Sequence, residues 1–218
     1  GTEIAARFAD EYKVPLILGV NQLDGEKANW EGTIEGLKEA FGSKPVIIQF
    51  PVNAGLGFDG FVDVLKMKYY HFVDDNGKRE DLEIPAEYID EAEELRQALI
   101  EKAAEYDDSL MEKFFDQGEL DEDEIRKGLG IGIRQGEAMP IFCLSAKKSI
   151  GVKRLMEFTI KVAASPAERE AELLNGSSLA CDDKGKTALF IYKTQLEQHL
   201  GEVAYFKVMS GVVTLGQD

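Results

Sequence analysis

Two short, uninterrupted apolar runs constrain the fold of this chain more than any other feature. They cover residues 14–20 and 139–144, and each is followed by a polar turn and then by an amphipathic helical pattern. Continuous apolar runs of this length are typical of strands that are buried on both faces of a parallel sheet. Because strands that alternate with helices define the α/β class, the sequence predicts an α/β fold.

The remaining segments are predicted to be helices and further strands around this sheet. The spacing of apolar residues predicts helices over 1–13, 27–41, 86–105, 107–117, 121–134 and 151–163. A further strand is predicted over 44–50, a β-hairpin around 61–73 and 78–84, and antiparallel strands over 187–193 and 203–209. The first helix carries Ile4, Phe8 and Tyr12 on one apolar stripe.

The negative charge of the chain is concentrated in one segment. The net charge is −16, and residues 74–127 hold 21 acidic and 7 basic side chains, whereas the other residues hold 20 and 18. An acidic chain repels phosphate, so binding of duplex nucleic acid by its bulk is not expected. The concentration predicts a separate module or a surface that faces a partner, although a charged helix such as 86–105 can also be a plain solvated face.

The sequence also limits where the protein works. No run approaches about 18 consecutive apolar residues, so no transmembrane helix is expected, and no membrane partner. The first residues lack the apolar core of a signal peptide, which favours a cytoplasmic location. Two cysteines, Cys143 and Cys181, are too few for a disulfide scaffold and are predicted to be buried thiols.

Several apparent motifs do not fit their usual chemistry. Residues 55–60 satisfy G-x-G-x-x-G, but a strand pattern follows them where a dinucleotide site needs a helix. Gly185-Lys186-Thr187 ends like a P-loop but has Ala180 where the P-loop needs glycine. His71 and His199 lie far apart without ligand-like spacing. No catalytic residue and no metal ligand is therefore expected in this chain.

The two polar turns after the apolar runs carry the clearest functional pattern. Ligands of α/β sheets bind at the carboxyl ends of strands, and both turns are predicted to lie there. Asp24 can accept both N–H groups on one edge of guanine, the Ala146 N–H can donate to guanine O6, and Ser145 can hydrogen-bond Asp24. The alternative for Asn-Gln-Leu-Asp alone is a plain turn. These turns therefore predict guanine recognition by Asp24, Ser145 and Ala146.

These residues resemble the GTPase domain of elongation factor G, the ribosomal translocase, and the resemblance covers nearly the whole chain. The matching segments are 14–24, Pro51 with 58–63, 84–86, 99–101, 106–113, 140–152, 188–194 and 208–211. The resemblance implies part of a P-loop-type GTPase domain over 1–42 and 138–164. It implies an inserted acidic α+β subdomain over 43–137. Residues 165–218 would be a linker and the first strands of an antiparallel β-barrel.

The resemblance also implies a ligand site, a function and its partners. Asn21, Gln22 and Asp24 would bind the guanine base of GTP, and Ser145, Ala146 and Lys147 would close over it. Family members use GTP and Mg²⁺ to drive tRNA and mRNA through the ribosome. Their P-loop, switch segments and Mg²⁺ ligands precede the matching region, so this chain alone is expected to be inactive as a GTPase. Contacts with rRNA and tRNA are expected from domains outside this chain. The acidic helix would face the ribosomal stalk protein through Asp90, Glu94 and Glu101.

Two residues depart from the family pattern. Gln22 stands where the family usually has lysine, and Leu144 stands where glycine is common. The missing lysine charge favours a second hypothesis, a ribosome-binding paralogue with weak or no nucleotide hydrolysis. A third hypothesis is a ribosomal protection GTPase of the tetracycline-resistance type.

Overall fold

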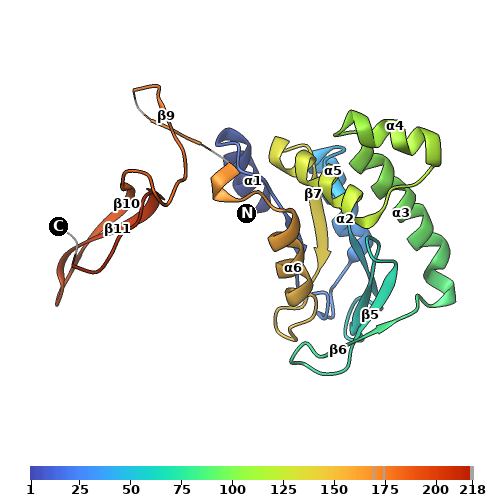
Figure 1. Ribbon diagram of the computed structural model, residues 1–218. Coiled ribbons are helices and arrows are strands. Elements are labelled where there is room, and N and C mark those ends of the chain that lie inside the picture. Colours follow the sequence, from blue (N-terminus) through green and yellow to red (C-terminus); the bar gives the residue numbers. More distant parts are fainter. Residues whose placement is uncertain (169, 174, 217–218) are drawn as a thin grey trace. The chain divides into compact units, whose positions relative to one another are not determined.

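A computed structural model describes residues 1–168, 170–173 and 175–216 of the chain (Figure 1). It divides into two compact units, residues 1–163 and 164–218. The first unit holds α1 (Thr2–Glu11), α2 (Trp30–Phe41), η1 (Ala86–Tyr88), α3 (Ile89–Ala104), α4 (Asp108–Gln117), α5 (Glu122–Gln135) and α6 (Val152–Val162). Each unit is described by itself below.

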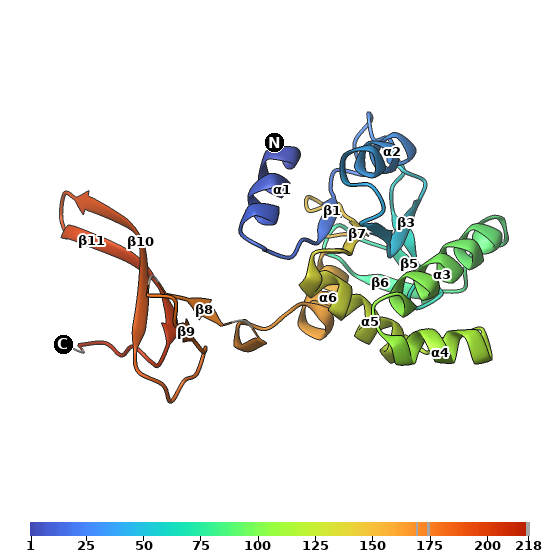
Figure 2. The ribbon, with the colours of Figure 1, turned by 90° about the horizontal axis from the view of Figure 1, so that it is seen from above.

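A parallel three-stranded sheet forms the centre of the first unit. Its strands are β1 (Leu18–Val20), β2 (Pro45–Ile47) and β7 (Met139–Cys143), in the order β1-β7-β2. Both outer strands pair with β7 in parallel, which confirms the predicted mixed α/β class. All of β7 is buried, whereas β1 is only partly buried because it has a single neighbour strand. Figure 2 shows α2 and α6 on opposite sides of β7.

The strand predicted over 44–50 is wrong, because the chain passes here from one sheet to another. β2 ends at Ile47, and β3 (Gln49–Val52) begins a separate antiparallel sheet. Between them, the Ile48 N–H donates to the Ile141 carbonyl (3.3 Å), and the Ile48 carbonyl accepts from the Val64 N–H (2.9 Å). The expected insertion over 43–137 therefore contributes a strand to the parallel sheet.

The antiparallel sheet is a meander in which each strand pairs with the next along the chain. It consists of β3, β4 (Gly60–Asp63), β5 (Lys68–Phe72) and β6 (Arg79–Leu82). The first arm of the predicted hairpin, 61–73, is wrong as a single strand, because it consists of β4 and β5, which pair with each other. The second arm, 78–84, corresponds to β6, which pairs with β5 as predicted. Gly60, the last glycine of the G-x-G-x-x-G motif, begins a strand, and a Cβ there would overlap the Tyr70 carbonyl oxygen. The glycine thus serves strand packing.

Helices α4 and α5 begin at acidic caps that explain part of the local charge. The Asp107 side chain accepts from the N–H groups of Ser109 and Leu110 at the start of α4. Asp121 and Glu124 form a reciprocal capping box at the start of α5. Carboxylates at these positions satisfy free backbone N–H groups and match the helix dipole. Some of the acidic residues of this segment therefore define helix boundaries.

Helix α5 is packed through glycines on both of its sides. A Cβ at Gly128 would overlap the Ala103 carbonyl oxygen of α3. On the opposite side, a Cβ at Gly130 would lie 3.4 Å from the Val162 carbonyl oxygen of α6. The α3 side therefore requires glycine, because a Cβ there would overlap the backbone, whereas the distance on the α6 side is an ordinary van der Waals contact.

A buried polar network joins the meander to β7 and α6. Arg154 Nε donates to Asp63 Oδ2 (2.6 Å), and the two residues are 3% and 0% exposed. Asp63 also accepts from the Lys66 N–H (2.9 Å) and from Gln49 Nε2 (3.3 Å). Gln49 Oε1 in turn accepts from the Cys143 N–H (3.1 Å). Each buried charge thus has a partner, as burial requires.

The large apolar side chains of α1 are exposed, and the helix buries Ala6 and Ala9. Of the two free thiols, Cys143 is buried as predicted, whereas Cys181 is exposed. Burial raises the pKa of the Cys143 thiol well above its ordinary value.

The second unit consists mainly of one long β-hairpin. Its elements are η2 (Pro166–Glu168), β8 (Ala171–Glu172), β9 (Ser178–Leu179), β10 (Ala188–Glu197) and β11 (Gly201–Ser210). β10 pairs with β11 in antiparallel fashion, which confirms the two strands predicted over 187–193 and 203–209. The antiparallel pair β8–β9 was not predicted. Large apolar side chains of the hairpin, including Phe190, Ile191 and Tyr192, remain exposed within this unit.

Candidate functional site

The two predicted loops lie side by side at the carboxyl edge of the parallel sheet. The last residues of the strands before them, Val20 of β1 and Cys143 of β7, are paired directly. Beyond them, the Leu144 N–H donates to the Val20 carbonyl (2.9 Å), and the Leu23 N–H donates to the Leu144 carbonyl (3.3 Å). The parallel pairing therefore brings together two loops that are more than 100 residues apart in sequence.

A side-chain hydrogen bond closes this junction. Asn21 Oδ1 accepts from the Ala146 N–H at 2.9 Å. The Ala146 N–H is therefore engaged within the protein, which corrects the expectation that it is open to guanine O6. The Ser145 hydroxyl accepts from the Lys148 N–H (3.2 Å), which corrects the expected bond from Ser145 to Asp24.

The first loop is held by its backbone and directs its polar side chains outward. Gln22 has φ 64°, the left-handed region that costs a non-glycine residue about 1 kcal/mol. Its carbonyl accepts from the Gly25 N–H (2.9 Å), which closes a tight turn. Leu23 is buried and anchors the loop, while Asn21 and Gln22 are exposed and Asp24 is half-buried. These polar side chains are accessible to a ligand.

The second loop is a tight closed turn. Ser145 is buried, and its backbone exchanges both hydrogen bonds with Ile150 (3.1 and 3.0 Å). Gly151 has φ 79°, and a Cβ there would overlap the Cys143 carbonyl oxygen, so only glycine fits. Ala146 and Lys147 are exposed at the tip. The turn thus presents these two residues beside the first loop.

Leu144 is accommodated by glycines on either side of it. A Cβ at Gly19 would lie 2.7 Å from Leu144 Cδ1, and a Cβ at Gly151 would lie 3.0 Å from Leu144 Cδ2. The bulk of Leu144 is therefore matched by missing side chains at its two neighbours. The departure from glycine at this position leaves the junction of the two loops intact.

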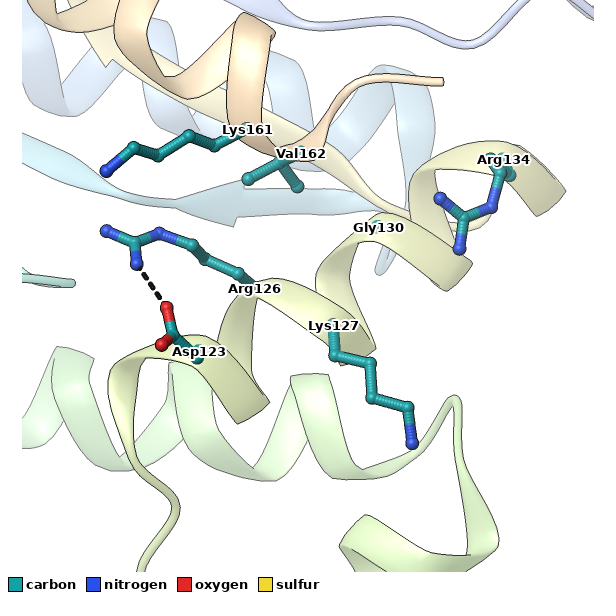
Figure 3. Close-up of a pocket in the computed structure, with 7 residues that line it drawn as sticks. All are labelled: Asp123, Arg126, Lys127, Gly130, Arg134, Lys161 and Val162. Carbon is teal, nitrogen blue, oxygen red and sulfur yellow. Dashed lines mark hydrogen bonds and ion pairs between the residues drawn. The ribbon is translucent and has the colours of Figure 1, made fainter. Parts of the chain in front are cut away.

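The residues brought together offer groups that are suited to binding a polar ligand. Asp24 offers acceptors, Gln22 and Asn21 offer amides, and Lys147 offers a cation. Within the described residues, no cluster of three or more His, Cys, Asp or Glu side chains could hold a metal ion. Pockets of about 410 and 590 Å³ lie elsewhere, between α5 and α6 (Figure 3) and beside α1. The loops form an open edge.

The acidic residues predicted to face a partner lie on the outer side of α3. Asp90, Glu94 and Glu101 are all exposed, and Gln97 Nε2 donates to Glu101 Oε1 (3.1 Å). Leu99 and Ala103 on the same helix are buried against the core. The structure therefore places the three carboxylates in solvent.

Sequence reasoning missed the residues that position the second loop. Gln49 holds the Cys143 N–H, two residues before Ser145, and Asp63 binds Arg154 in the first turns of α6. The available signal was a carboxylate at Asp63 within an otherwise apolar strand pattern. A charge at such a position indicates a buried partner.

Comparison with solved structures shows what this chain is similar to. No family model matches this chain. The crystal structure of a protein from Thermus thermophilus superposes with a TM-score of 0.81 at 26% sequence identity, over 96% of this chain and 29% of that chain. None of the helices among the described residues is both long and apolar enough to span a membrane. This chain thus spans less than a third of a longer protein with a similar fold.

Proposed function

We propose that this chain is part of an elongation factor G-like GTPase, and that its two joined loops bind the guanine base of GTP and GDP. The observation that carries the proposal is the Asn21–Ala146 hydrogen bond, which fixes the two predicted loops to each other at the ligand-binding edge of the sheet. The residues of the two loops resemble the guanine-reading motifs of that family. The proposed site consists of Asn21, Gln22, Asp24, Ser145, Ala146 and Lys147.

The proposal gives each of these residues a role. The Asp24 carboxylate accepts from guanine N1–H and N2–H, a pair of donors that adenine does not have. Because Asn21 Oδ1 faces the Ala146 N–H, Asn21 Nδ2 remains to donate to guanine O6 or N7. Lys147 covers one side of the base. Ser145 shapes the second loop through Lys148. Mg²⁺ would neutralise phosphate charge on residues outside this chain.

In the parent protein, this activity would drive tRNA and mRNA through the ribosome in the cytoplasm. The exposed carboxylates of Asp90, Glu94 and Glu101 support a contact with the stalk protein, and the exposed hairpin β10–β11 supports the start of a β-barrel domain. Gln22 favours one alternative, a ribosome-binding paralogue that uses nucleotide weakly. A ribosomal protection GTPase of the tetracycline-resistance type would contain the same loops.

The guanine contact is tested by Asp24→Asn in the full-length protein. An amide can donate to the C2 carbonyl of xanthine, so the variant should lose GDP affinity by about tenfold to a hundredfold and gain affinity for XDP. Asp116→Asn, on the exposed face of α4, is the matched control and should leave both affinities unchanged. Equal GDP affinity of Asp24→Asn and the parent would refute the assignment.

The role of Gln22 is tested by restoring a charge. Gln22→Lys in the full-length protein should bind GTP and GDP about tenfold to a hundredfold more tightly and still reject ATP, because one charge-assisted contact is regained. Tighter binding would also show that the parent retains a working base site. Equal affinities would mean that the site is adapted to glutamine.

The stalk contact is tested by reversing charges on α3. Lysine at Asp90, Glu94 and Glu101 should slow association with the stalk protein at low salt, since surface charges act mainly on association rate. The control is the same reversal at three exposed glutamates of α2, which are Glu31, Glu35 and Glu39. If both triple variants bind equally, the acidic face of α3 is only a solvated surface.

A further inference from the structure

One end of the meander contacts both loops of the candidate site. Because each strand of the meander pairs antiparallel with the next, its first and third connections lie at the same end. These connections are residues 53–59, between β3 and β4, and residues 73–78, between β5 and β6. Figure 1 shows the second of them at the same end of the first unit as the turn before α6. Each connection contacts one of the two loops.

The connection between β3 and β4 holds the first loop. The Gly55 N–H donates to the Leu23 carbonyl (2.7 Å), and the Phe58 N–H donates to the Gly55 carbonyl (2.9 Å). Leu23 and Phe58 are each 1% exposed, so both sides of this contact are anchored in the hydrophobic core. The first loop is therefore fixed to the meander through its backbone.

The connection between β5 and β6 supports the second loop at Ser149. Gly77 has φ 80°, and a Cβ there would lie 3.0 Å from the Ser149 carbonyl oxygen and 3.3 Å from Ser149 Cβ. Ser149 itself has φ 56°, a left-handed conformation that persists in a non-glycine residue only where the surrounding structure holds it. The Ser149 N–H donates to the Ala146 carbonyl (3.4 Å). The supported residue is thus bonded to the exposed tip of the loop.

The turn that carries this glycine is itself fixed by hydrogen bonds. Asp74 Oδ1 accepts from the N–H groups of Asn76 (2.9 Å) and Lys78 (3.0 Å). The Val73 N–H donates to the Lys78 carbonyl (2.9 Å). Because the turn is closed in this way, a side chain added at its glycine would displace Ser149 by a few tenths of an ångström.

We propose that Gly77 is a positioning residue of the guanine site. By leaving room for Ser149, it determines where Ala146 and Lys147 lie relative to the first loop. This inference rests on the function proposed above and adds the meander to the site as a third part, which supports the two loops without contacting the base. A change at this end of the meander should therefore alter nucleotide affinity, although Gly77 lies outside both loops.

The test places asparagine at two glycines of similar backbone conformation in the full-length protein. Asparagine tolerates a positive φ, so Gly77→Asn can fold while its Cβ meets Ser149. Gly118→Asn is the matched control, because Gly118 has φ 75° and open space around its Cβ position. Thermal unfolding verifies that both variants fold. Gly77→Ala against Gly118→Ala repeats the comparison with a smaller side chain.

Two measurements are made on these variants. Affinity for GDP should be about threefold to tenfold weaker in Gly77→Asn than in Gly118→Asn, which corresponds to one weakened hydrogen bond. In the ligand-free protein, hydrogen exchange of residues 145–150, followed by mass spectrometry, should be faster by a similar factor in Gly77→Asn and unchanged in Gly118→Asn. The exchange measurement reports the displacement of the loop independently of any ligand.

Support for the positioning role requires both changes, and either one without the other overturns it. Faster exchange with unchanged GDP affinity would mean that the contact supports the fold alone. If Asp24→Asn loses GDP affinity while Gly77→Asn binds GDP as Gly118→Asn does, the guanine site stands and only the positioning role fails. If the parent protein does not bind GDP, the guanine assignment fails and the positioning role fails with it.

Discussion

Replacing Arg154 with methionine should destabilise the first unit by about 3–5 kcal/mol, because it leaves the Asp63 carboxylate buried without its cation. The pair is nearly inaccessible to water, at 3% and 0% exposure, and two hydrogen bonds of 2.6 and 3.4 Å join it. After the substitution, Asp63 keeps only the Lys66 N–H and Gln49 Nε2. These donors are too few for a buried carboxylate. Burial opposes the charge of Arg154, but Asp63 outweighs burial and raises the arginine pKa.

Urea unfolding, followed by tryptophan fluorescence, measures the free energy of unfolding of the first unit. Trp30 is the single tryptophan of the chain and is buried in the first unit, so the hairpin unit does not contribute to the signal. The double variant Asp63→Leu with Arg154→Met removes both charges and should recover most of the lost free energy. A loss below about 1 kcal/mol for Arg154→Met at an unchanged m-value would refute the reasoning.

Three further predictions follow from single contacts. Gly128→Ala should lower the free energy of unfolding by about 1–3 kcal/mol in the same assay, because the new methyl group meets a backbone carbonyl of α3. Gly130→Ala should be neutral or slightly stabilising. Equal effects of the two variants would contradict the packing described for α5. Hydrogen bonds from Lys127 and Ser109 hold the pKa of Asp107 below its ordinary value of 3.8. The charged Asp107 cap therefore stabilises the fold above pH 3.8, and this contribution is lost as the pH falls through the lowered pKa. Acid titration of α-helical circular dichroism should therefore be shallower in Asp107→Asn than in the parent, and identical curves would exclude the cap. Asn21→Ala should speed hydrogen exchange of the Ala146 amide by roughly threefold to tenfold, because the amide loses its acceptor. An unchanged exchange rate would contradict this prediction.

Helices and strands of this fold were predictable from the sequence where a local pattern of apolar residues alone determines them. The run at 139–144 became the fully buried central strand, because burial on both faces leaves no polar position. The break at Ile48 was not predictable, since an apolar run does not reveal that its two halves pair in different sheets.

The candidate site was predictable in position and less so in its contacts. Two loops that follow paired parallel strands must meet, and they do. Which side chain accepts from the Ala146 N–H depends on the left-handed turn at Gln22 and on rotamers, and neither is encoded in residue spacing. The buried partners of the second loop, Gln49 and Asp63, come from another sheet and are distant in sequence. Pairings of this kind follow from tertiary packing alone.

The double attachment of Ile48 has a mechanical consequence. Its N–H is fixed to the central strand and its carbonyl to the loop after β4, with no flexible linker between the two sheets. The meander therefore cannot rotate independently of β7, whose end carries the second loop. We therefore expect a displacement of the meander to move β7 with it, and with β7 the second loop and Ala146.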